Sequence, residues 1–131
     1  MTTMINLLPW REERRKQRQH EFIAMLAAKP EIEDLALTTN GTLLADKAES
    51  LARAGLDRVT VSLDALDETT FQAMSDSNIS VNRVLEGISA AQEAGLGPVK
   101  VNAVVQKGVN EHAIVDLARH FHGTGVSVRF I

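Results

Sequence analysis

Residues 55–67, GLDRVTVSLDALD, decide the fold class of this chain. Apolar and polar side chains alternate through the middle of this stretch, and a period of two is the pattern of a β-strand that buries one face. Gly55 follows a helical pattern, as glycine usually does just beyond a helix C-terminus. Asp67 suits the N-cap of a following helix. The stretch therefore predicts a helix end, a strand from Arg58 to Leu63, and a helix start.

The same succession of elements repeats along the chain. Strand patterns cover residues 35–38, 58–63, 99–105 and 126–131, and helical patterns cover residues 43–54, 67–74, 81–94 and 110–121. Gly95 is expected to close the third of these helices and Asn110 to cap the fourth. Strands separated by helix-length segments pair in parallel through right-handed crossovers. We therefore expect an α/β protein of consecutive β/α units with four parallel strands.

An N-terminal helix is expected before the first strand. The segment from Arg11 to Ala28 has no helix breaker and is rich in helix formers. Lys29 precedes Pro30, and a residue before proline is disfavoured in the helical region. Residues 1–30 hold six Lys or Arg and three Glu, a net charge of +3, whereas the whole chain carries −3, which leaves −6 for the remainder. This asymmetry predicts two parts, residues 1–29 and 30–131.

One face of the predicted sheet is polar. Alternate strand positions are occupied by Thr38, then Thr60, Ser62 and Asp64, then Lys100 and Asn102, then Ser127 and Arg129. A parallel sheet covered by helices on both faces would be apolar on both. Either the face is solvated because a second helix layer is lost, or it lines the polar lumen of a partial (β/α) barrel. Lys100 favours the lumen, since burial of an unpaired lysine is costly.

Four sequence blocks carry a resemblance to a known family. LTTNG at 37–41, VSLDALD at 61–67, VKVN at 99–102 and VRFI at 128–131 resemble the central part of GTP 3′,8-cyclases, radical S-adenosylmethionine (SAM) enzymes of molybdenum cofactor biosynthesis. The resemblance implies a partial barrel of the radical SAM type. It also implies that Thr38 and Lys100 bind GTP and that Ser62 binds SAM. All three residues belong to the polar face.

The chain departs from that family in the residues that hold its [4Fe–4S] cluster. It contains no cysteine, and the family's Cys-x3-Cys-x2-Cys loop is absent. Thiolates hold such clusters, and the cluster starts the radical reaction. We therefore expect no cofactor and no metal bound by this chain, no catalytic residue, and inactivity of the chain alone. Whether it acts as an enzyme is left open at this point.

A second resemblance concerns the first residues. MINLLPWREERRKQRQHEFIAML at 4–26 is similar to the cytoplasmic N-terminus of the type IV pilus assembly protein PilN. In that family the INLLP peptide docks on the actin-like protein PilM, which implies a partner-binding peptide made of Ile5, Asn6, Leu7, Leu8 and Pro9. The chain then resembles a fusion of two fragments. A PilM-binding adaptor is the alternative function.

Composition narrows the remaining possibilities. No apolar run approaches the roughly 20 residues that span a bilayer, and we expect a cytoplasmic protein. The basic stretch 11–18 is interrupted by Glu12 and Glu13, which indicates a solvated helix face in preference to nucleic-acid binding. His112, His120 and His122 are expected at helix ends or on the surface instead of on a metal. The open edge of the last strand predicts a homo-oligomer.

Overall fold

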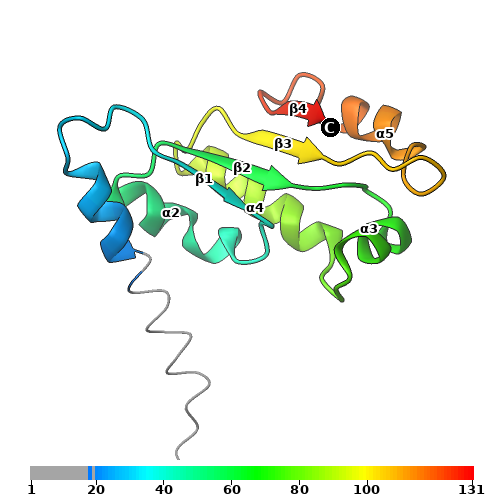
Figure 1. Cartoon of the computed structure of the whole chain (residues 1–131), viewed down its shortest axis with the longest axis horizontal. Helices are drawn as coiled ribbons and strands as arrows, with labels where there is room; N and C mark the ends of the chain where they lie inside the picture. The colour runs from blue at the N-terminus through cyan, green and yellow to red at the C-terminus, as the bar shows by residue number, and fades with distance from the viewer. Residues whose placement is uncertain (1–17, 19) are drawn as a thin grey trace, which may run out of the picture.

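The computed structural model describes residues 18 and 20–131. In order, the elements are β1 (Ala36–Thr39), α2 (Leu44–Ala54), β2 (Arg58–Ser62), α3 (Glu68–Ser75), α4 (Val81–Glu93), β3 (Lys100–Ala103), α5 (Ala113–Phe121) and β4 (Ser127–Phe130). The four strands form one parallel sheet in the order β1-β2-β3-β4 (Figure 1). The predicted α/β class, with parallel strands alternating with helices, is confirmed.

The helix boundaries follow the signals in the sequence. Asp67 is the N-cap of α3, and its Oδ2 accepts a hydrogen bond of 2.9 Å from the backbone N–H of Thr70. Gly55 follows α2 with φ of +110°, and its N–H donates to the carbonyl of Ala52. A Cβ at Gly55 would lie 2.4 Å from the Cβ of Ala27. Glycine is therefore required there both by the left-handed backbone and by close packing.

The hydrophobic core lies between one face of the sheet and the helices. The apolar positions of β2 and β3, including Val59, Val61 and Val101, are fully buried against the helices. Figure 1 shows α2 and α4 side by side against this face. Gly87 permits their close approach, because a Cβ there would lie 3.0 Å from the Cβ of Leu44, the first residue of α2.

The end of the N-terminal helix packs on the same core. Residues 20–27 are helical, and Ile23 is buried in the core cluster. The ring Nε2 of His20 lies 2.8 Å from the Oγ of Ser50 in α2. The domain boundary placed after residue 29 stays a prediction, and the peptide at residues 5–9 lies outside the described part of the chain.

One helix start was wrongly predicted. Asn110 does not cap a helix: α5 begins at Ala113, with His112 at the N-cap position. Residues 107–112 form a turn in which the side chain of Asn110 is buried. From this turn the buried amide bonds backbone groups of Asp64, Val104 and Gln106, which lie outside it, so the side chain is turned inward and does not cap α5. Among residues 18 and 20–131, no helix is long and apolar enough to cross a membrane.

Candidate functional site

The strand register places the predicted ligand residues on one surface. Thr38 of β1 pairs with Thr60 of β2, and Thr60 pairs with Lys100 of β3. These three residues therefore form one row across the sheet, continued on β4 by Ser127. The side chains of Thr38 and Lys100 are exposed, so the polar face predicted from the strand alternation is confirmed.

A second row lies nearer the carboxyl ends of the strands. Ser62 pairs with Asn102, and Asn102 pairs with Arg129. Strand spacing puts the Cα atoms of Thr38 and Lys100 about 10 Å apart, and the second row lies about 7 Å further along the strands. Ser62 therefore belongs to the second row, whereas Thr38 and Lys100 belong to the first. It lies on β2, the strand between β1 and β3, which carry the other two residues. The three residues share a face, and no direct contact joins them.

The charge on this face is mainly positive toward β3 and β4. Lys100 and Arg129 are exposed cations on neighbouring strands. The nearby carboxylate of Asp64 is held by the backbone, because its Oδ1 accepts a hydrogen bond of 2.8 Å from the N–H of Val104. The arrangement suits an anionic ligand that contacts both cations.

Asn110 joins the carboxyl ends of β2 and β3, a role that the sequence reasoning missed. Its side chain is 1% exposed. Its Nδ2 donates to the carbonyls of Asp64 at 2.9 Å and Val104 at 2.7 Å, and its Oδ1 accepts from the N–H of Gln106 at 2.7 Å. The amide therefore fixes the two loops that border the polar face.

The three histidines singled out in the sequence are exposed and near the ends of α5. His112 lies 3.3 Å from Oδ1 of Asp67 and 3.3 Å from Oγ1 of Thr70. Hydrogen bonds from Thr70, with a smaller contribution from His112, lower the pKa of Asp67 below its usual value. Within the described residues no group of three or more His, Cys, Asp or Glu could hold a metal ion.

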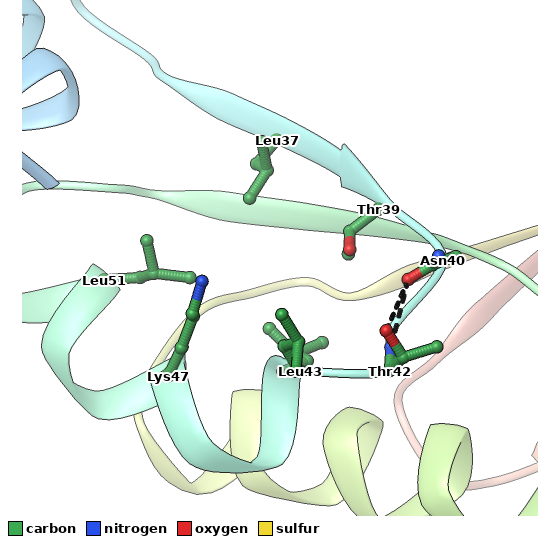
Figure 2. Close-up of a pocket in the computed structure, with 8 residues that line it drawn as sticks. Leu37, Thr39, Asn40, Thr42, Leu43, Lys47 and Leu51 are labelled. Carbon is green, nitrogen blue, oxygen red and sulfur yellow. Dashed lines mark hydrogen bonds between the residues drawn. The ribbon is translucent and has the colours of Figure 1, made fainter. Parts of the chain in front are cut away.

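A small pocket lies away from the polar face, at the free edge of β1. Its volume is about 110 Å³, and it opens between β1 and α2. Figure 2 shows Leu37 and Thr39 of β1 pointing toward Leu43, Lys47 and Leu51 on and just before α2. Leu37 and Thr39 have the strand parity that faces the helices, so the pocket and the row containing Thr38 are on opposite sides of β1.

Residues 10–121 match the Radical SAM superfamily, and the chain belongs to that family. Its relatives include GTP 3′,8-cyclases. The chain is 54% identical over 110 residues to the one from Xanthomonas axonopodis pv. citri (strain 306), covering 84% of this chain and 33% of the relative. Identity is 51% over 110 residues to the enzyme of Acidothermus cellulolyticus, covering 84% and 30%, and 44% over 111 residues to that of Listeria welshimeri serovar 6b, covering 85% and 33%. The chain thus spans about a third of the length of these curated relatives.

The donor set of this chain does not fit the family's cofactor cluster. Radical SAM proteins use a [4Fe–4S] cluster and SAM, and the cluster needs thiolate ligands. These 131 residues contain no cysteine. The polar face carries hydroxyl, amide and cationic groups and the carboxylate of Asp64, and none of these is a thiolate that could hold the cluster.

Proposed function

We propose that this chain forms the substrate-side wall of a GTP 3′,8-cyclase-like site and is inactive by itself. The observation that carries the proposal is the register that sets Thr38 and Lys100 in one row, with Ser62 one row beyond them. The similarity to GTP 3′,8-cyclases supports the assignment of GTP to Thr38 and Lys100 and of SAM to Ser62.

The chemistry of the face matches a nucleoside triphosphate. The ammonium group of Lys100 and the guanidinium of Arg129 would bind phosphate oxygens through charge-assisted hydrogen bonds. The hydroxyl of Thr38, two strands away, would orient the opposite end of the same ligand. The role of this chain is therefore to bind and orient, and no proton or electron transfer is assigned to its residues.

Calorimetric titration of the chain with GTP tests this proposal. We expect weak binding, because a half-site contacts only part of the ligand. Lys100→Ala should lower the affinity at least fivefold, whereas Lys29→Ala, which removes an exposed lysine at the end of the N-terminal helix, should not change it. An absence of heat at millimolar GTP, or equal affinities for the two variants, would refute the assignment.

A second candidate function concerns the first residues. We propose that Ile5 to Pro9 form a peptide that docks on a PilM-like protein. In support, the superfamily match begins only at residue 10 and leaves this peptide outside it. The double variant Asn6→Ala, Leu7→Ala should abolish capture of PilM in a pull-down, with Thr2→Ala as the control. Undiminished capture by the double variant would eliminate this function.

A further inference from the structure

Both outer strands of the sheet have an unpaired edge among the residues that the structure describes. β1 pairs only with β2, and β4 only with β3. Unpaired edges present backbone N–H and C=O groups to any chain that can add a strand. Because all four strands are parallel, β4 of one molecule could continue the sheet beside β1 of another without reversing direction.

The helices alternate with the strands in the order that a (β/α) barrel requires. A packed helix or helical segment directly precedes each strand: residues 20–27 before β1, α2 before β2, α4 before β3, and α5 before β4, with the short α3 as an additional helix between β2 and α4. Four helix–strand units are half of the eight in a closed (β/α) barrel. Figure 1 shows the helix at residues 20–27 beside α2, near the amino end of the sheet. Two copies would supply eight strands, with this helix next to the junction between β4 of one copy and β1 of the other.

The helix at residues 20–27 has an exposed apolar flank. His20 contacts Ser50 of α2, and Ala27 lies against Gly55 just after α2, so this side of the helix faces its neighbour. A helical period of 3.6 residues puts Phe22 on the flank away from α2, with Met25 further round. Phe22 is 56% exposed and Met25 is similarly exposed.

The flank of α5 that faces away from α4 is complementary to the apolar flank of residues 20–27. His120 borders a surface hollow with residues of α4, which shows which flank of α5 faces α4. Ala118 lies on the opposite flank, and the exposed Val115 lies beside it. These small side chains leave room for Phe22 of a second copy.

A protruding ring and a pocket of similar size occur at the two strand edges. Phe130, near the carboxyl end of β4, is 37% exposed and has the parity of the helix-facing residues Val126 and Val128. The pocket of about 110 Å³ lies at the carboxyl end of β1 and is lined by Leu37, among others (Figure 2). Its lining combines leucines with the polar side chains of Thr39, Asn40, Thr42 and Lys47. A phenyl ring that enters would contact the leucines, whereas the polar groups would stay at the opening.

Charge is complementary at the other end of the same edges. Glu31 and Glu33 are exposed just before β1. The last turn of α5, which leads into β4, carries the basic residue Arg119. Parallel pairing of β4 with β1 of a second copy aligns the amino ends of both strands, so these carboxylates would lie near the basic turn.

We propose that two copies of this chain close an eight-stranded barrel about a twofold axis. β4 of each copy pairs with β1 of the other, and Phe130 of each copy enters the pocket of the other. Such a head-to-tail contact forms a closed ring when the rotation is half a turn. The two polar faces then line one lumen. This inference goes beyond the proposed function and does not depend on GTP binding.

Sedimentation equilibrium of the 131-residue chain is the first test. We expect a species of twice the 14.3 kDa mass of one chain. Phe130→Glu and Phe22→Glu should each raise the dissociation constant at least tenfold. Val109→Glu, at an exposed apolar position in the turn before α5, should leave it unchanged. Circular dichroism would verify that each variant is folded. A monomer at every concentration, or equal effects of all three substitutions, would overturn the proposal.

Cross-linking tests closure of the ring. The chain has no cysteine, so introduced thiols are unique. With a short bismaleimide, Phe22→Cys and Ala118→Cys should give covalent dimers when mixed and none when treated separately. The double variant should stop at dimers, because both seams close within one ring. A ladder of longer products would indicate an open head-to-tail chain and overturn the barrel, and cross-linking of a single variant with itself would overturn the assigned seam.

Discussion

The two faces of the sheet differ in almost every physical respect. On the helix side, the side chains of Val59, Val61 and Leu63 are completely excluded from solvent. On the other side, Ser62 and Lys100 are exposed, and the charge is mostly positive. Stability is therefore expected to come from the first face and ligand binding from the second. Substitutions that separate these two properties are the sharpest test of the division.

The largest effect is expected on the apolar face. Leu63→Ala removes a fully buried side chain at the carboxyl end of β2. It should lower the free energy of unfolding by about 2–5 kcal/mol, the usual cost of such a cavity. Urea denaturation followed by circular dichroism measures this loss. Its neighbour gives the control: Ser62→Ala should change stability by less than about 0.5 kcal/mol. Equal losses of stability for Leu63→Ala and Ser62→Ala would show that the two faces of the sheet contribute alike to folding.

The next largest effect is expected at Asn110, which joins the carboxyl ends of β2 and β3. Asn110→Ala leaves the carbonyls of Asp64 and Val104 and the N–H of Gln106 without their buried partner. The expected loss is about 1–3 kcal/mol, the cost of unsatisfied buried groups. Asn82→Ala, on the exposed side of α4, is the matched control. Urea denaturation of both variants measures this loss. An unchanged midpoint for Asn110→Ala would show that the buried hydrogen bonds contribute nothing to stability.

A smaller loss is expected in the helix layer at Gly55. Gly55→Ala places a Cβ against Ala27 in a left-handed backbone conformation and should cost about 1–2 kcal/mol. Gly95 has φ of +80° but open space around it, so Gly95→Ala reports the backbone penalty alone. The difference between the two thermal midpoints measures the packing of the N-terminal helix on α2. Identical midpoints would mean that this contact does not contribute to stability.

The sequence predicted most of this arrangement because its signals are local. Strand alternation identified both faces, and Gly55 and Asp67 marked helix ends correctly, since each acts through its own backbone neighbours. Asn110 was misassigned because its bonds reach Asp64, 46 residues away in sequence, which no local pattern shows. The edge pocket was missed for the same reason, because β1 and α2 form it only after packing. The register that aligns Thr38 with Lys100 likewise required the folded sheet.

A modest, pH-dependent effect on the free energy of unfolding is expected at Asp67, the N-cap of α3. Its lowered pKa means that the folded state favours the carboxylate. The resulting stabilisation is present above the usual carboxyl pKa and is lost as pH falls through the lowered folded value. Asp67→Ala should cost about 1 kcal/mol at neutral pH and less in acid. Because the group is exposed, the electrostatic share is small. Urea midpoints at pH 7 and pH 3 measure this, and a pH-independent loss would contradict it.

The smallest effect on stability is expected at Lys100, and this substitution returns to the contrast between the faces. The side chain is exposed, and its removal takes away no buried surface. Lys100→Ala should therefore change the free energy of unfolding by less than about 0.5 kcal/mol. Urea denaturation of the variant that is titrated with GTP measures both properties on one protein. Reduced GTP affinity with unchanged stability would assign Lys100 to binding alone, whereas a stability loss above 1 kcal/mol would show that the polar face also contributes to folding.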